Sequence, residues 1–413
     1  MGSLIVTDIG ELVTADGSGV GEPALGLVHD AEIVVVGHEV VYAGPRGGGP
    51  RPADLPPPVA IDSVDGRLVS PGLCDPHTHP LWAGERTREF DLRNQGVRYA
   101  EIQRQGGGIL ATVRATTAAS DEALIAGMRA RLHRMLAQGV TRCEAKTGYG
   151  LLPAAELRLL DLLVQAAAGQ PVSVSPTLLC HVPPPGLSPA ERADLVAALA
   201  AILPEAKRRG AEALDVYCDE GAFTLAETEF LLRAGRAAGL RLRCHAEQFT
   251  HTGAAERAAC LGATSVEHLE QIDPAGVVAL ARAGTVANLL PGAALTLRLP
   301  WPDARRLIDA GVRVALGTDL NPGTSLSESL PLMMTLACTQ MGMSCAEAWL
   351  AVTIHAAHAV GSSGRLRAGA RADIVVWDAE GYREVCQHFG VPLAQRVYIA
   401  GQLVWEAAPG PAR

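Results

Sequence analysis

The feature that most constrains the fold is a repeat of short apolar segments that alternate with alanine- and leucine-rich segments of helical length. We identify eight expected strands, at 70–77, 139–146, 172–181, 214–218, 241–245, 264–268, 285–290 and 312–319. Eight strands alternating with helices predict an α/β fold, a (β/α)8 TIM barrel. A doubly wound parallel sheet is the structural alternative, but the number and order of the segments favour the barrel.

Both ends of the chain show a different pattern, in which short β segments are separated by turns rich in proline and glycine. These segments are 4–14, 31–43 and 58–70 near the N-terminus, and 373–377 and 396–404 near the C-terminus. We expect the two ends to form one small β domain from residues 1–69 and 366–413, with the barrel over residues 70–365.

Composition limits the kinds of partner. The chain has 413 residues, of which 48% are hydrophobic, and its net charge is -9. No basic cluster resembles a nucleic-acid-binding surface, and no stretch of about 20 apolar residues could span a membrane. The N-terminus lacks the basic region and long apolar core of a signal peptide. The nine cysteines include no Cys-x-x-Cys pair, which is typical of reduced thiols in a cytoplasmic protein.

Polar side chains lie at the C-terminal ends of several expected strands. They are His77, His79, His181, His245, His268 and Asp319. In a barrel these strand ends converge on the face that carries the active site. Any one of these histidines alone would more often be structural, but their equivalent positions indicate a common site.

A metal centre is the chemistry that this set favours. His77 and His79 point to the same side of a strand, because side chains alternate along it. Together with His245 and Asp319 they would make a four-ligand set for a catalytic zinc or a similar divalent ion. Neighbouring cysteines should not join it. These are Cys74, Cys180 and Cys244. Each lies an odd number of residues from the adjacent histidine and therefore on the opposite strand face, so we expect it to pack against the outer helices.

Three phrases carry a family resemblance: PGLCDPHTH at 71–79, KTGYGL at 146–151 and TDLNPGTS at 318–325. The HTH element is shared by many hydrolases, whereas the other two phrases are much more specific. The sequence resembles the imidazolonepropionase family of the amidohydrolase superfamily. The resemblance implies a composite β-sandwich domain beside the barrel and one divalent or trivalent metal ion, zinc or iron. At the superfamily level it also implies a possible homodimer.

The family reaction is the third step of histidine degradation. It is the metal-dependent hydrolysis of the ring amide of 4-imidazolone-5-propanoate to N-formimidoyl-L-glutamate, with a metal-bound hydroxide attacking the ring carbonyl. By this resemblance His268 would polarise the carbonyl or move protons. Asp319 could also take the proton of the water, and the sequence leaves that division open.

Substrate contacts follow from the same resemblance, matched residue by residue. Arg86 would bind the propanoate, for which the arginine fork is suited. Tyr149 and His181 would contact the carboxylate end or the ring, and Gln248 would hydrogen-bond the imidazolone, although some relatives carry Glu there. The product's glutamate portion would be contacted by Asn321, Gly323 and Thr324.

Lys146 bears on the number of metal ions. Many amidohydrolases hold two metals bridged by a carboxylated lysine on the fourth strand, but Lys146 falls on the second expected strand and the fourth has no lysine. We therefore predict a single metal. Glu144 shares a strand face with Lys146, so an ion pair inside the barrel or at its rim is the preferred interpretation.

Two alternative functions stay open. Another mononuclear amidohydrolase, such as a deaminase or formimidoyl deiminase acting on a related nitrogen compound, would share the metal ligands but would not need Arg86 with Tyr149. A catalytically silent barrel that binds metal or a ligand would be expected to lack one of the ligands, and all four are present along with His268.

Overall fold

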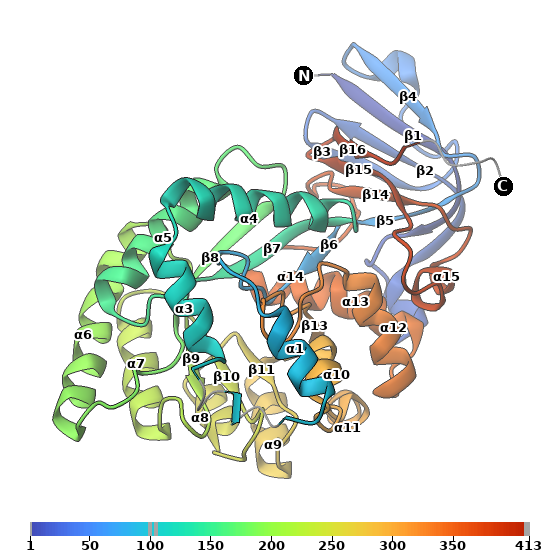
Figure 1. The fold of residues 1–413 in the computed structure, drawn as a ribbon. Helices are drawn as coiled ribbons and strands as arrows, with labels where there is room; N and C mark the ends of the chain where they lie inside the picture. Colours follow the sequence, from blue (N-terminus) through green and yellow to red (C-terminus); the bar gives the residue numbers. More distant parts are fainter. Residues whose placement is uncertain (1, 98–100, 103–105, 409–413) are drawn as a thin grey trace.

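The computed structural model describes residues 2–97, 101–102 and 106–408, which form two eight-stranded sheets (Figure 1). One sheet is made of consecutive parallel strands in chain order. The other joins strands from the two ends of the chain. This arrangement confirms the predicted TIM barrel with a small β domain built from both ends.

The barrel strands pair with their neighbours in sequence order. They are β6 (Leu73–Asp75), β7 (Val140–Lys146), β8 (Ser173–Cys180), β9 (Ala213–Cys218), β10 (Arg241–Ala246), β11 (Ser265–His268), β12 (Val286–Leu289) and β13 (Val314–Leu316). The segments that follow β6 and β13 come together through a parallel bridge between Thr78 and Leu320. The Thr318 hydroxyl donates to Asp75 (2.6 Å), which further ties the last strand to the first.

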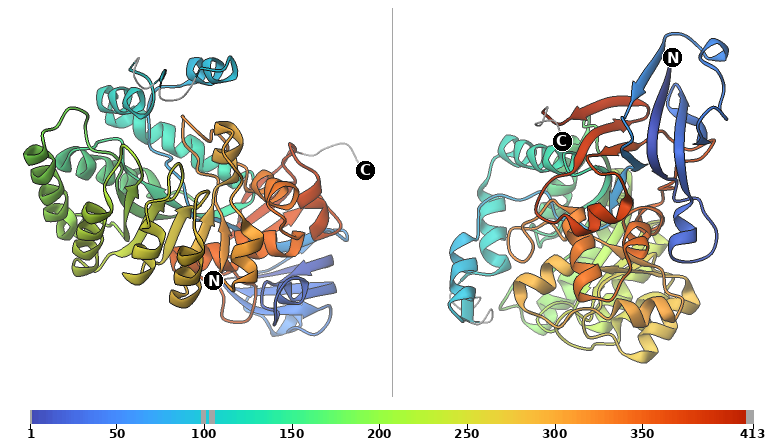
Figure 2. Two further views of the ribbon diagram at one scale, coloured as in Figure 1. Left: turned by 90° about the horizontal axis from the view of Figure 1, so that it is seen from below. Right: turned by 90° about the vertical axis from the view of Figure 1, so that its right-hand side faces the viewer.

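Helices surround the barrel (Figures 1 and 2). They are α1 (Thr87–Asn94), α3 (Ile109–Ala118), α4 (Asp121–Leu136), α5 (Pro153–Ala167), α6 (Pro189–Arg208), α7 (Leu225–Ala237), α8 (Ala254–Cys260), α9 (Pro274–Ala283), α10 (Pro291–Leu297), α11 (Ala304–Asp309), α12 (Leu330–Gln340), α13 (Cys345–Val352) and α14 (Ile354–Val360). Helices α6, α7 and α13 begin with a capping box, in which a Ser or Thr and a Glu three residues later satisfy each other's backbone N–H groups. Within the described residues, no helix is both long and apolar enough to cross a membrane.

The second sheet has the strand order β16-β15-β14-β5-β1-β2-β3, with β4 paired to β1. Its strands are β1 (Ser3–Val13), β2 (Leu27–Val36), β3 (Glu39–Pro45), β4 (Val59–Ser63), β5 (Leu68–Pro71), β14 (Ile374–Trp377), β15 (Ala394–Ile399) and β16 (Gln402–Glu406). Helix α15 (Tyr382–Gln387) connects β14 to β15, and two short 3-10 helices, Glu22–Leu25 and Pro52–Asp54, lie in the N-terminal loops. Apolar side chains such as Val6, Ile33 and Val376 fill a separate core under this sheet.

The expected strand at about 70–77 is divided between the two sheets. Residues 68–71 form β5, which pairs with β1 and β14, whereas residues 73–75 form β6 of the barrel. Gly72 makes the crossing possible, because a Cβ atom there would lie 2.1 Å from the Thr141 hydroxyl oxygen. The predicted stretch 396–404 also divides, into the hairpin of β15 and β16. The domain limits at 69/70 and 365/366 stay a prediction.

Candidate metal centre and substrate cavity

The floor of the candidate site is formed where the first and last barrel strands meet. The backbone N–H of Asp319 donates to the carbonyl of His77 (3.1 Å), and that of His79 donates to Leu320 (2.9 Å). This pairing brings three side chains together. Nε2 of His79 lies 3.3 Å from Nε2 of His77, and Oδ1 of Asp319 lies 3.5 Å from His77 Nε2 and 3.4 Å from His79 Nε2.

These three atoms have the chemistry and spacing of metal ligands. Atoms bound at about 2.0–2.1 Å to a tetrahedral zinc are separated from one another by about 3.3–3.4 Å. Nδ1 of His77 faces the Glu267 carboxylate at 2.9 Å. When Nδ1 carries the proton of that hydrogen bond, the Nε2 lone pair points toward His79 and Asp319. A cation between them would relieve this convergence of lone pairs and negative charge.

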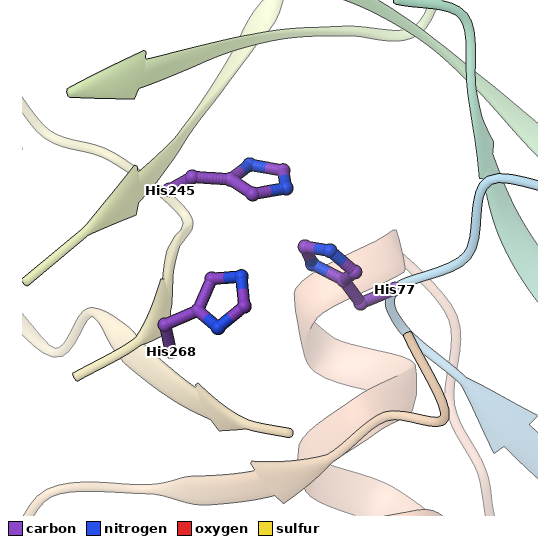
Figure 3. A group of neighbouring side chains, drawn as sticks. All are labelled: His77, His245 and His268. Carbon is purple, nitrogen blue, oxygen red and sulfur yellow. The ribbon is translucent and has the colours of Figure 1, made fainter. Parts of the chain in front are cut away.

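His245 and His268 extend the cluster. His77, His245 and His268 each offer a ring nitrogen within 4.8 Å of those of the other two (Figure 3). Strand alternation would place His268 on the opposite face from Glu267. The backbone of His268 has a φ of 75° instead, and both side chains are buried. The backbone of Asp319 also lies in the left-handed region, with a φ of 51°. Such conformations cost non-glycine residues free energy and concentrate at functional sites.

Carboxylates behind two of the histidines orient their rings. Glu267 faces Nδ1 of His77, and Asp215 lies 3.0 Å from Nδ1 of His245. A metal-binding histidine commonly directs its second nitrogen to such a group, which fixes the ring. Burial lowers the pKa of His77, but hydrogen bonds with Asp319 and Glu267 outweigh it and raise the pKa to about 9. Burial opposes the charge on Asp319, yet His77 and His79 hold its pKa well below the usual range.

Lys146 lies in a buried ionic network below the histidines. Its Nζ is 2.7 Å from both Glu144 and Asp215, and all three side chains are fully buried. The predicted ion pair between Glu144 and Lys146 is therefore confirmed, and Asp215 is an additional partner. Burial disfavours the charged lysine, but Asp215 and Glu144 raise its pKa above the usual value. Single-metal occupancy stays a prediction, and within the described structure Lys146 is part of this network.

Above the floor lies a cavity of about 600 Å³. Most of the residues singled out from the sequence line it. They are His79, Arg86, Tyr149, His181, His245, Gln248, His268, Asp319, Asn321 and Thr324. Two others do not line this cavity. His77 is fully buried in the floor, and Gly323 packs behind Arg86, with its carbonyl accepting a hydrogen bond from Arg93 (2.8 Å).

Comparisons with known proteins agree with this site. A family model described as "Amidohydrolase family" matches residues 96–404. The chain is 43% identical over 407 residues to imidazolonepropionase from Myxococcus xanthus (97% of this chain, 96% of the relative). It is 45% identical over 401 residues to the enzyme of the same name from Rubrobacter xylanophilus (94% of this chain, 95% of the relative). The chain belongs to the imidazolonepropionase family.

Solved structures of more distant proteins share the fold. A triazine hydrolase variant matches with a TM-score of 0.77 at 17% identity, covering 98% of this chain and 95% of that chain. An adenosine deaminase from Xanthomonas campestris, solved with bound zinc, matches with a TM-score of 0.72 at 15% identity, covering 97% of this chain and 92% of that chain. At these identities the likeness concerns the fold alone.

In this imidazolonepropionase-family site, Arg86 lies on the cavity wall at the start of α1. Its guanidinium is held by Glu89, with Nε at 2.9 Å and Nη2 at 2.6 Å from Oε2. Nδ1 of His181 is 3.1 Å from the carbonyl of Gly148, and its ring stacks on that of His79 at 5.7 Å. Burial lowers the pKa of His181 to about 3, so the imidazole is neutral near pH 7.

The loop at 321–324 is held by its own hydrogen bonds. Oδ1 of Asn321 accepts from the N–H groups of Gly323 and Thr324 (2.8 Å each), and its Nδ2 donates to the carbonyl of Asp319 (2.7 Å). The Asn321 amide therefore fixes the loop next to Asp319. Of the three predicted residues in this loop, Asn321 and Thr324 reach the cavity wall.

Sequence reasoning missed several residues of the site. Tyr217 lines the cavity, and its hydroxyl donates to Gln248 Oε1 (2.9 Å). Asp215 and Glu267 were also missed. Each is a charged residue inside an otherwise apolar strand, and such a residue indicates a polar group that faces the interior. Glu270 is different. Its side chain is fully buried, and Oε1 lies 3.6 Å from Nδ1 of His268. Neither carboxylate oxygen has a hydrogen-bond partner among the described residues.

The three cysteines next to the histidines pack away from the site as predicted. Cys180 and Cys244 belong to the main apolar core. Cys74 packs with Ala356, Ala359 and Val360, which lie on α14. Burial raises the pKa of Cys74 to about 12, which leaves a neutral thiol.

Proposed function

We propose that this protein hydrolyses the ring amide of 4-imidazolone-5-propanoate to N-formimidoyl-L-glutamate. The observation that carries the proposal is the composition of one cavity. It is lined on its floor by histidines and Asp319 and on its wall by Arg86, Tyr149 and His181. The first set suits amide hydrolysis, and the second suits a planar nitrogen ring with a carboxylate. The family membership of the chain points to the same reaction.

His77, His79, His245 and Asp319 would hold a single ion, zinc or iron. Such an ion supplies Lewis acidity, which polarises a carbonyl and makes a hydrolytic water more acidic. The carboxylates of Glu267 and Asp215 keep the rings of His77 and His245 oriented, with Nε2 free to act as a ligand. Zinc-bound solved structures of the same fold, including an atrazine chlorohydrolase complexed with zinc, are consistent with this choice.

His268 and Asp319 divide the proton transfers in this proposal. The Asp319 carboxylate, which lies against two ligand histidines, accepts the proton of the attacking water. His268 holds the carbonyl oxygen and delivers a proton to the ring nitrogen as the C–N bond breaks, and the proton taken up by Asp319 then replaces the one that His268 has lost. Glu270 acts as a positioning residue. Its carboxylate faces Nδ1 of His268, and a small rotation of the ring would turn the 3.6 Å separation into a hydrogen bond.

Recognition of the substrate is assigned to the cavity wall. Arg86 forms a charge-assisted pair with the propanoate, oriented by Glu89. The neutral imidazole of His181 and the hydroxyl of Tyr149 contact the carboxylate end or the ring. Gln248, held by Tyr217, hydrogen-bonds the imidazolone. The loop from Asn321 through Gly323 to Thr324 contacts the glutamate portion of the product, with Gly323 acting through its backbone. We also propose a cytoplasmic location and, at the superfamily level, a homodimer.

The test follows loss of imidazolone absorbance with metal-replete protein. Turnover of 4-imidazolone-5-propanoate supports the proposal. Its absence, together with good activity on a purine or pyrimidine amine, would overturn it in favour of a deaminase. Arg86→Ala should raise KM about 10–150-fold, because a hydrogen bond to a charged group contributes about 1.5–3 kcal/mol. Arg86→Lys is the matched control for the fork geometry, and metal content should be unchanged in both variants.

A further inference from the structure

We propose that Cys338, Cys345 and Cys386 form a binding site for one thiophilic metal ion, separate from the candidate catalytic centre. Their Sγ atoms all lie within 4.8 Å of one another. The three residues come from three helices that contact one another: α12, α13 and α15 (Figure 1). This inference is independent of the proposed hydrolysis, since none of the three residues lines the substrate cavity.

Spacing and ligand type suit such an ion. Zinc binds thiolates at about 2.3 Å, which places the sulfurs of a tetrahedral site about 3.8 Å apart. Side-chain rotations of the three cysteines can close the remaining gap. Thiolates are soft ligands that select zinc and copper(I) over magnesium or calcium. We therefore assign the site to this class of cation, bound by three sulfurs with a further position left for a small external ligand.

Electrostatics favour a thiolate in this cluster. Cys345 is the first residue of α13, where the helix dipole stabilises negative charge. Hydrogen bonding from Cys386 lowers the pKa of Cys345 to about 6, and the charge of Arg383 acts in the same direction. Hydrogen bonding with Cys338 and Cys345, together with burial, raises the pKa of Cys386 well above its usual value. The Cys345 thiolate thus lies beside the protonated thiol of Cys386, and an incoming cation would displace that proton.

The cluster is both held in place and accessible. The Thr335 hydroxyl on α12 donates to the carbonyl of Cys386 (2.7 Å), and Nε1 of Trp349 on α13 donates to the carbonyl of Tyr382 (2.8 Å). Cys386 is buried, whereas Cys338 and Cys345 are half-buried, so an ion can enter from solution. Because α15 connects strands of the second sheet and α13 packs on β13 and β6, a bound ion would link the two sheets.

The experiment titrates metal into reduced protein whose catalytic site is already loaded. Cobalt(II) is the spectroscopic substitute for zinc, and copper(I) forms a second arm. One equivalent of cobalt should produce thiolate-to-metal charge-transfer absorption in the near ultraviolet. The candidate catalytic ligands include no thiolate, so this band reports the cysteine cluster. Cys338→Ser and Cys386→Ser should each lose the band, and Cys260→Ser, at an exposed cysteine outside the cluster, should keep it.

A second measurement uses the unmodified protein, so that a misfolded variant cannot decide the outcome. Bound metal should protect Cys338, Cys345 and Cys386 from alkylation, as mapped by peptide mass spectrometry, while Cys260 reacts equally with and without metal. A band with copper(I) alone would assign the site to copper, and a band with cobalt would assign it to zinc. No band in either arm, unchanged alkylation, or a disulfide between two of the three cysteines would overturn the proposal.

Discussion

Two groups of possible metal ligands occur in the part of the chain that the structure describes, and they are built differently. The barrel-mouth cluster consists of residues at or just after the C-terminal ends of barrel strands, above a buried ionic network: His77, His79, His245, His268 and Asp319. The cysteine cluster (Cys338, Cys345 and Cys386) lies near helix ends, where the packing of the helices and the hydrogen bonds between them set the distances. At the barrel mouth, fixed interior charges therefore organise the site before any ligand binds. The cysteine cluster has no comparable support among the described residues.

The largest expected effect is at Asp319. Asp319→Asn removes the negative charge that faces His77 and His79. We expect turnover to fall about 10²–10⁴-fold, the range of general acid–base contributions, together with loss of metal from the barrel mouth. Steady-state kinetics and elemental analysis measure both. Asp309→Asn, at an exposed helix position, is the control. Retention of metal and full turnover would show that Asp319 is misassigned.

Lys146→Ala tests the buried network that supports the barrel mouth. Without the ammonium group, the buried carboxylates of Glu144 and Asp215 both lose the cation that lies 2.7 Å from them. Breaking a buried ion pair in this way costs about 3–5 kcal/mol of the free energy of unfolding. Urea denaturation measures the change. Lys207→Ala removes the only other lysine, which is exposed, and should change stability little. Equal stability of both variants would mean that the network does not support the fold.

Glu270→Gln separates function from stability at the barrel mouth. We expect kcat to fall about 10–100-fold, as for other residues that orient a catalytic group, with KM and metal content unchanged. The free energy of unfolding should stay equal or rise, because a buried carboxylate without a partner is costly. Kinetics and denaturation on the same samples measure both. Glu256→Gln, on the exposed side of α8, is the matched control. A loss of stability with normal kcat would assign Glu270 a structural role.

The smallest effect concerns the cysteine cluster in metal-free protein. The alkylation rate of Cys345 should rise with pH and level off above a midpoint of about 6, because the thiolate is the reactive form. In Cys386→Ser the midpoint should move, because the substitution alters the hydrogen bond that lowers the pKa of Cys345. Turnover should be unchanged in this variant. A Cys345 profile that is the same in both proteins would argue against communication between the thiols.

Much of the fold could be predicted from the sequence because it depends on local patterns of apolar and polar residues. Eight alternating segments predicted the barrel, and matching β segments predicted that the chain ends meet. The positions of polar residues at strand ends predicted that most of the candidate site would lie together. Parity along the strands also predicted the Glu144–Lys146 pair and the outward packing of Cys74, Cys180 and Cys244.

Other features were decided only by the tertiary structure. A left-handed backbone at His268 turns it toward the same interior as Glu267, which alternation would not allow. Glu270 becomes significant only because its carboxylate is buried beside His268 with no hydrogen-bond partner in the described part of the chain. No local sequence pattern relates Cys338, Cys345 and Cys386, since helices from two parts of the fold carry them. Sequence patterns report the period of a local element and the face of each side chain. Contacts between elements depend on how those elements pack, so only the assembled structure fixes them.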